Sequence, residues 1–177
     1  FAILMVAPCA WGAYATTADS SPDISGDASA AARAHIFKLS IPDIAESLIG
    51  MPYQYGGNPD ITGTTDNSHL FFTLYTRAAE KAGLRFIDYQ PMRFFLKNFT
   101  AVEETQVQVG DLILLNNNHA AMIYKKEKSG KIYCIYASEK RKKVLTFNSD
   151  NLVFTIYWLE NIKGFYRLKE RTLQRAQ

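Results

Sequence analysis

Cysteine is scarce in this chain: its 177 residues include two, Cys9 and Cys134. The sequence has no Cys-x-x-Cys pair and no cysteine–histidine spacing of the kind that binds zinc. If Cys9 is removed with an export signal, Cys134 has no partner for an internal disulfide. We therefore expect neither a disulfide scaffold nor a metal site, and we expect no cofactor.

A strong excess of one charge sign is also lacking. The formal net charge is +3, which is too small to indicate nucleic acid, and no nucleic-acid-binding motif stands out. The cations are nevertheless uneven and gather on both sides of one apolar run. Such groups are typical of solvated hairpin turns; the alternative is a patch that attracts an anionic polymer or an acidic partner. The two groups are Lys125, Lys126, Lys128 and Lys131, and Lys140, Arg141, Lys142 and Lys143.

No apolar run is long enough to cross a bilayer, which takes about 20 residues as a helix. The most apolar stretch, residues 1–15, carries no charge, and Ala13-Tyr14-Ala15 fits the small-x-small rule of a signal cleavage site. Residues 1–15 are thus a signal-peptide-like segment, and we expect an exported protein of the periplasm or cell envelope without a transmembrane span. Cys9 leaves an alternative open, a lipid anchor that would tie the protein to the outer membrane.

The rest of the chain divides into a tether, one domain and a tail. Residues 16–30 are rich in Thr, Ser, Ala, Asp and Gly without an apolar period, which is typical of a flexible tether, and we place this tether at residues 16–38. With 47% hydrophobic residues the chain can bury one full core, and we place this domain at residues 39–170. Residues 171–177 form a charged tail that we expect to fray.

Two helices are predicted at the start of the domain. In the first, Ser40 is a suitable N-cap and Pro42 suits the first turn, so the helix is expected to run to about Ile49. In the second, apolar residues recur at helical spacing from Leu70 to Ala82. Asp66 stands where its N-cap belongs, and Gly83 stands where its C-terminal cap belongs.

Strands are predicted in the second half of the domain. Apolar and β-branched runs at residues 110–115, 120–124, 131–137 and 154–158 indicate four strands, and residues 165–168 indicate a last edge strand. Ser129-Gly130 is a plausible hairpin turn between the second and the third. Because helices come first and an antiparallel sheet follows, the fold class is α+β.

Several separated motifs occur in an order that points to one family. Gly50–Gly57 reads GMPYQYGG, Asp66-Asn67-Ser68-His69 opens the second helix, and Gly110-Asp111-Leu112-Ile113 precedes His119. Over residues 41–168 this frame resembles the NlpC-type papain-like cysteine peptidases, bacterial cell-wall endopeptidases with PY-x-[WY]-GG, D-C-S-G and GDL-[VI] motifs. The resemblance implies a papain-like NlpC-type fold, with N-terminal helices packed on a central antiparallel β-sheet.

The resemblance also implies a catalytic site, and this chain departs from it. A papain-like site needs a cysteine at a helix N-terminus, a histidine base and a third polar group that orients the imidazole. Asn67 stands at the cysteine position, His119 matches the base and Tyr136 replaces the third residue. An asparagine amide has no ionisable nucleophile and cannot form a thioester. The resemblance therefore implies a degenerate member of the family, with no functional catalytic residue.

Five further residues are expected to line the former substrate cleft: Tyr53, Tyr55, Asp66, Ser68 and His69. In active relatives the two tyrosines line the cleft, and here they either bind a ligand or pack its wall. His69 takes the place of the family's small glycine and fills space in the first helical turn. The single remaining cysteine, Cys134, is expected to be a small buried strand residue.

We expect a catalytically inactive NlpC-type domain that serves as a structural or binding component of a bacterial cell-envelope assembly, such as a secretion system. Its partners would be envelope proteins of a larger complex, with weak peptidoglycan contact and no nucleic acid. Partner contacts are expected on the tether, the lysine-rich segments and the tail. The alternative is an active peptidoglycan endopeptidase that cleaves stem-peptide amide bonds, which requires Asn67 to be an artefact or a mutation of the nucleophilic cysteine.

Overall fold

The structure of the chain is a computed structural model that describes residues 24–117, 119–152 and 154–176. The signal-like segment 1–15, Cys9 and the first part of the predicted tether lie outside these described residues. Within the described ranges no helix combines the length and the apolar character needed to cross a membrane.

The first helix, α1, spans Ile24–Leu48 and is longer than predicted. Residues 24–38 are helical and not a loose tether, so that prediction is wrong over this range. The physical reason is the alanine-rich composition of residues 28–34, because alanine has the highest helix propensity and needs no apolar period. Ser40 is therefore inside the helix and does not cap it; its hydroxyl donates back to the Ile36 carbonyl at 2.8 Å.

The helix that carries the predicted site, α3, spans Asn67–Lys81. Asp66 is its N-cap, and the chain leaves the helix at Ala82 and Gly83, where Gly83 has a positive φ of 66°. Both predicted ends are confirmed. A short helix, α2, at Pro59–Thr62 lies in the loop before it, with Asn58 as N-cap.

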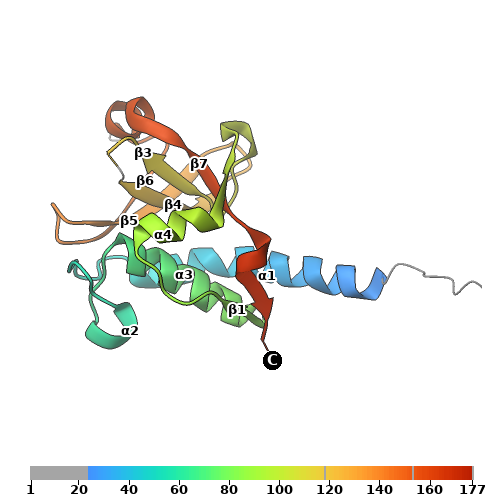
Figure 1. The fold of residues 1–177 in the computed structure, drawn as a ribbon. Helices are drawn as coiled ribbons and strands as arrows, with labels where there is room; N and C mark the ends of the chain where they lie inside the picture. The colour runs from blue at the N-terminus through green and yellow to red at the C-terminus, as the bar shows by residue number, and fades with distance from the viewer. Residues whose placement is uncertain (1–23, 118, 153, 177) are drawn as a thin grey trace, which may run out of the picture.

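A six-stranded antiparallel sheet with the strand order β2-β7-β3-β4-β5-β6 packs on these helices (Figure 1). The α+β class with N-terminal helices on an antiparallel sheet is confirmed. The predicted turn at Ser129-Gly130 is confirmed by a hydrogen bond from the Gly130 N–H to the Glu127 carbonyl at 3.0 Å. The strands are β2 Phe99–Val102, β3 Leu112–Leu115, β4 Ala120–Lys126, β5 Ile132–Ser138, β6 Lys143–Asn148 and β7 Ile162–Leu168.

Two strand predictions are wrong. Phe154–Trp158 is a π-helical turn. Phe154 and Trp158 are buried, and the three residues between them are exposed. That is a helical spacing and not the alternation of a strand. The strand that follows β5 along the chain is instead β6, which begins at Lys143 inside the second lysine-rich group. The last predicted strand, β7, exists but lies between β2 and β3, so it is not an edge strand.

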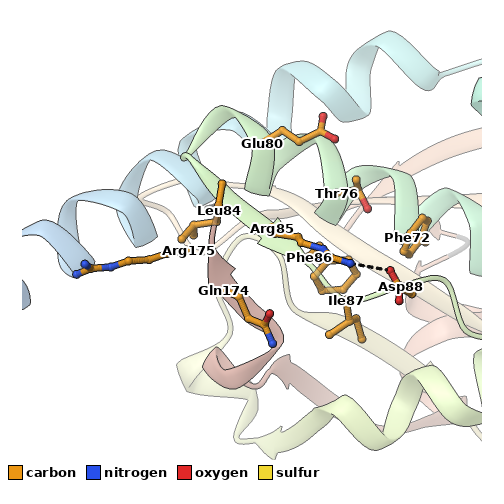
Figure 2. A pocket seen from close by; sticks show the side chains of 11 residues that line it. Phe72, Thr76, Glu80, Leu84, Arg85, Phe86, Ile87, Asp88, Gln174 and Arg175 are labelled. Carbon is orange, nitrogen blue, oxygen red and sulfur yellow. Dashed lines mark hydrogen bonds and ion pairs between the residues drawn. The ribbon is translucent and has the colours of Figure 1, made fainter.

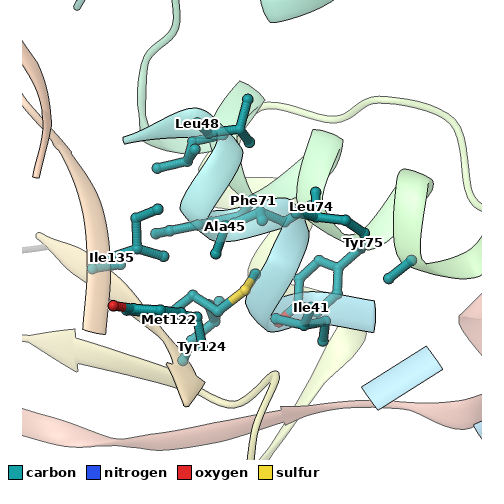
Figure 3. Packing of buried hydrophobic residues seen from close by; sticks show 14 of the residues in the cluster. Ile41, Ala45, Leu48, Phe71, Leu74, Tyr75, Met122, Tyr124 and Ile135 are labelled. Atoms are coloured by element: carbon teal, nitrogen blue, oxygen red, sulfur yellow. The ribbon is translucent and has the colours of Figure 1, made fainter. Parts of the chain in front are cut away.

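The sheet is covered on both faces. Figure 3 shows the larger core, where Ile41, Ala45 and Leu48 of α1 and Phe71, Leu74 and Tyr75 of α3 meet Met122, Tyr124 and Ile135 of the sheet. On the opposite face Ile113, Ile123 and Cys134 pack with Phe154 and Trp158 in a second cluster. Successive residues of β3 alternate between the two clusters, as strand geometry requires.

The charged tail is more ordered than predicted. Strand β8, Leu173–Arg175, pairs antiparallel with β1, Leu84–Phe86, in a separate two-stranded sheet. The turn Glu170–Thr172 leads into β8, and Thr172 is buried. The predicted frayed tail is therefore wrong for residues 171–176. The remaining short helices are α4 Met92–Phe95, η1 Leu96–Asn98, η2 Glu104–Gln106 and η4 Leu159–Asn161.

The Gly110-Asp111 motif holds the sheet to the helices. The Asp111 carboxylate is 1% exposed and accepts hydrogen bonds from Arg167 Nε at 3.0 Å and Nη2 at 2.8 Å. The Tyr75 hydroxyl of α3 donates to the Gly110 carbonyl at 2.6 Å, and Gly110 has a φ of +91° that favours glycine. In this chain the motif is thus a structural joint between α3, β3 and β7.

The two lysine-rich groups do not form one hairpin. Lys125–Lys131 brackets the β4–β5 turn, and Lys140–Lys143 brackets the β5–β6 turn. Because both turns connect to β5, they lie at opposite ends of that strand. A ligand could therefore meet one group without the other.

Candidate functional site

The carboxylate of Asp66 organises the N-terminus of α3. Its Oδ1 accepts hydrogen bonds from the His69 N–H at 2.9 Å and the Ser68 hydroxyl at 2.8 Å, and its Oδ2 accepts from the Gly56 N–H at 2.9 Å. Burial raises the pKa of the Asp66 carboxyl, but these hydrogen bonds outweigh it and leave that pKa below its ordinary value. Asp66 is therefore a charged helix cap that also ties down the preceding glycine loop.

The two glycines of that loop have different physical roles. Gly56 has a φ of +71°, which most side chains avoid. At Gly57 an added Cβ would collide with the Thr64 side chain and lie 3.0 Å from the Gln54 carbonyl oxygen. The motif thus lets the loop fold back on residues 64–65. Tyr53 is left half-buried beneath Lys142, whose Nζ is 5.7 Å from the ring centroid, and Tyr55 is 88% exposed.

Asn67 is the first residue of α3, where a papain-like nucleophile belongs. Its side-chain Oδ1 accepts a hydrogen bond from the backbone N–H of Ala137 in β5 at 2.7 Å. The amide is half-buried, and its oxygen is engaged by the sheet. Asn67 therefore joins helix to strand, and its amide has no ionisable group comparable to a thiol.

His119 lies directly before β4, exposed, with its backbone N–H bonded to the Asn117 side chain at 3.1 Å. It shares a pocket of 190 Å³ with Asn67. The structure thus brings the predicted base and the predicted nucleophile position to one place. Of the expected cleft residues, Tyr53, Tyr55, Asp66 and Ser68 line the same pocket, and Met92, Ala137 and Glu139 join them.

Tyr136, at the third position, does not face Asn67. Its ring packs edge-on against Phe147 at 5.7 Å and Trp158 at 5.6 Å, and it lines a second pocket of 530 Å³ together with His119. Within the described part of the chain, the His119 imidazole has no hydrogen-bond partner that would fix its orientation. His119, Ala137 and Glu139 line both pockets, so the two pockets adjoin along the end of β5.

His69 does not line the pocket around Asn67. Its ring stacks on Tyr89 with centroids 4.0 Å apart, and its Nδ1 lies 3.3 Å from Asp66 Oδ1. The Tyr89 hydroxyl is within 3.1 Å of the Ser68 hydroxyl. Tyr89 therefore covers this side of the helix terminus. No local sequence motif predicts its contacts with His69 and Ser68.

Ser68, Asp66 and His69 are close together but are not connected as a catalytic triad. In a triad the histidine lies between serine and aspartate and takes the serine proton. Here Asp66 lies between Ser68 and His69, and the Ser68 hydroxyl donates directly to the carboxylate. The arrangement stabilises the helix start and does not activate the serine.

Cys134 is fully buried in the second core cluster, and burial raises the pKa of its thiol. Cys134 is not placed to act as a nucleophile, because a buried neutral thiol within a strand has neither access nor thiolate character. Among the residues that the structure describes, no group of three or more His, Cys, Asp or Glu side chains could hold a metal ion.

A larger hollow of 630 Å³ lies between α3 and the β1–β8 pair, away from the predicted site residues (Figure 2). Phe72 and Phe86 contribute apolar surface to it, and Arg85 and Asp88 form an ion pair at its side at 3.3 Å. The Thr76 hydroxyl is buried beside it without a hydrogen-bond partner in the described ranges. Its charged lining residues balance in sign: Glu80, Arg85, Asp88 and Arg175.

Comparison with known proteins supports the fold. A solved Staphylococcus aureus subsp. aureus Mu50 protein, described as similar to a lipoprotein of the NLP/P60 family, matches 75% of this chain with a TM-score of 0.53 and 20% identity. This chain spans 41% of that protein's length. The peptidoglycan hydrolase RipB of Mycobacterium tuberculosis matches 88% of this chain and 71% of its own, with a TM-score of 0.42 and 18% identity. No family model and no curated protein matches the sequence. The chain thus has an α+β fold of the NLP/P60 type.

Proposed function

We propose that this chain is a catalytically inactive NlpC-type domain that acts as a structural or binding component of a bacterial cell envelope. The observation that carries the proposal is Asn67 at the nucleophile position, with its Oδ1 held by the Ala137 N–H at 2.7 Å. Cysteine peptidases need a thiolate at this point. An amide that accepts a backbone hydrogen bond serves packing and supplies no chemistry.

Two further features support an inactive site. A working base needs a partner that holds its imidazole in one tautomer, and the Tyr136 ring is turned toward Phe147 and Trp158. Neither Ser68 nor Cys134 is placed to act as a substitute, since Ser68 donates to Asp66 and Cys134 is buried. Loss of a triad nucleophile removes most of the rate enhancement, on the order of a millionfold in one enzyme.

The same proposal includes a location and a class of partners. The signal-like segment 1–15 favours export, and the Staphylococcus protein that shares the fold is described as similar to a lipoprotein. A domain without a nucleophile contributes through binding. We therefore propose envelope proteins as the main partners, with weak peptidoglycan contact through the pocket around Asn67.

The direct test is a digestion of purified peptidoglycan, with an active cell-wall endopeptidase as positive control. We expect the chain to release no soluble muropeptides above the level without protein. Release that rises with protein concentration and disappears in His119→Ala would overturn the proposal and establish the alternative, an active endopeptidase.

A further inference from the structure

The proposed inactive site does not account for the second pocket, which lies beside the pocket around Asn67. We call it the aromatic pocket and define it by Tyr136, Tyr157, Trp158, His119, Glu139 and Lys140, around a volume of 530 Å³. It opens at the end of β5, beside the pocket that contains Asn67, and the two share His119 and Glu139. An extended ligand could therefore run from one pocket into the other.

The walls of the aromatic pocket are held by ring packing. The Trp158 ring stacks on Phe147 with centroids 4.7 Å apart and meets Tyr136 at 5.6 Å and Tyr157 at 6.3 Å. Trp158 is 2% exposed, so its position is fixed from below by the second core cluster. Aromatic surfaces that are ordered before binding lose little conformational entropy when a ligand arrives.

Positive charge is concentrated in the turn that begins at the pocket with Lys140. Lys140 lines the pocket, and Arg141, Lys142 and Lys143 follow it in the β5–β6 turn. All four side chains belong to exposed residues, and within the described residues none of them forms an ion pair. Glu139 is the one acidic residue that lines the pocket. The surroundings therefore favour an anionic ligand.

The segment that contributes Tyr157 and Trp158 to the pocket also has exposed apolar side chains. Four large side chains of the segment 152–159 are exposed to solvent: Leu152 at 70%, Ile156 at 57%, Leu159 at 47% and Tyr157 at 45%. Large exposed apolar side chains on a segment that lines a hollow favour a protein-interaction site. Aromatic anchors at the centre with polar residues around them are the usual arrangement of energetically important contacts.

We propose that the aromatic pocket and the basic turn Lys140–Lys143 bind an extended acidic segment of a partner protein, which inserts one aromatic or large aliphatic side chain. This inference rests on the proposed binding function and names the partner's chemistry. The pocket fits an apolar anchor, and the four cations of the basic turn fit the flanking carboxylates. A basic segment would be repelled, and an uncharged segment would form no ion pair with these cations.

The test uses the full chain and short fluorescently labelled peptides, with binding followed by fluorescence anisotropy. One peptide has Asp and Glu around a central Trp; a second replaces Trp by Ala; a third replaces the acids by Lys around the Trp. We expect the acidic Trp peptide to bind about tenfold more tightly than either of the others. Its affinity is expected to fall as salt is raised from about 0.05 to about 0.3 M, because exposed charges are screened.

Variants at the aromatic pocket and the basic turn, each with a matched control elsewhere, test where the peptide binds. Lys140→Glu is expected to weaken binding about tenfold, whereas Lys128→Glu changes the net charge equally at the other end of β5 and is expected to have little effect. Tyr157→Ala is expected to weaken binding about tenfold, whereas Ile36→Ala on α1 removes a similarly exposed apolar side chain without effect. Unchanged circular dichroism and melting temperature show that each variant is folded.

Two outcomes would overturn the inference. One is equal weakening by Lys140→Glu and Lys128→Glu, which would show attraction by net charge alone. The other is a peptidoglycan fragment that binds the wild-type chain, loses affinity in Tyr157→Ala and is not displaced by the acidic Trp peptide. Neither outcome bears on the inactive site, because peptidoglycan digestion is measured separately and does not depend on this peptide.

Discussion

The side-chain oxygen of Asn67 accepts a hydrogen bond from the backbone N–H of Ala137, which lies 70 positions further along the chain. The bond fixes the first turn of α3 against the end of β5. Ala137 lines both pockets, so the same bond positions the wall between them. A residue at the nucleophile position thus holds together the surface that we propose to bind partners.

Removing this bond is expected to lower stability. In Asn67→Ala the buried Ala137 N–H loses its acceptor, and an unpaired buried donor costs about 1–3 kcal/mol of unfolding free energy. Denaturant unfolding followed by circular dichroism measures the difference. Asn67→Asp keeps an acceptor oxygen in place and is the matched control. An equal loss in both variants would show that the bond is not the cause.

Restoring the thiol alone is expected not to restore catalysis. In Asn67→Cys the sulfur stands at the N-terminus of α3, but Tyr136 packs on Trp158 and cannot orient the His119 imidazole. We expect peptidoglycan release to remain at the wild-type background in a muropeptide assay. Robust turnover by this single variant would show that the site is intact apart from its nucleophile.

The Asp66 cap is expected to make stability depend on acid pH. The pKa of Asp66 in the folded chain lies below its ordinary value of 3.8, so the folded state favours the carboxylate. Its stabilisation is complete well above pH 3.8 and is lost as pH falls through the lower folded-state pKa. Asp66→Asn keeps a capping oxygen but has no charge to titrate.

The measurement for the cap is the unfolding free energy of wild type and Asp66→Asn from pH 7 down to about pH 2.5. We expect the advantage of the wild type to be constant near neutrality and to shrink below the ordinary carboxyl pKa. A difference that stays constant over the whole range would mean that the charge of Asp66 does not stabilise the fold.

The ion pair of Asp111 and Arg167 is expected to contribute much more to the free energy of unfolding than an exposed pair. Arg167→Met leaves a carboxylate that is 1% exposed without its cation, which costs about 3 kcal/mol of unfolding free energy. Arg85→Met breaks the exposed pair with Asp88 and is expected to cost less than about 1 kcal/mol. Chemical denaturation of the two variants compares them, and similar losses would contradict a structural role for Asp111.

The helix and strands with strong local patterns could be predicted from the sequence. Helix α3 has an apolar stripe and both caps, and β3, β4 and β5 are apolar runs separated by turn residues. The start of α1 was missed because alanine favours a helix without any amphipathic period. Strands β1 and β8 are three residues each and exist through pairing with each other, which no local pattern encodes.

The candidate site could be predicted from the sequence only where its residues belong to local motifs. Motif order predicts that Asn67 and His119 meet, and they line one pocket because each lies at the end of a regular element. The stacking of Tyr89 on His69 and the turn of Tyr136 toward Trp158 depend on segments remote in sequence. These tertiary contacts decide what the pockets can bind, so the aromatic pocket could not be seen in the sequence.

The pairing of β1 with β8 and of β2 with β7 has a consequence for how the chain is made. During synthesis α1, α3, β1 and β2 leave the ribosome early, whereas the strands that complete β1 and β2 come after β6. Neighbouring strands β3 to β6 can pair as they emerge, but β1 and β2 must wait for partners of high sequence separation. Open strand edges attract other chains in the interval. We therefore expect the nascent domain to be most exposed to aggregation until β7 and β8 are synthesised.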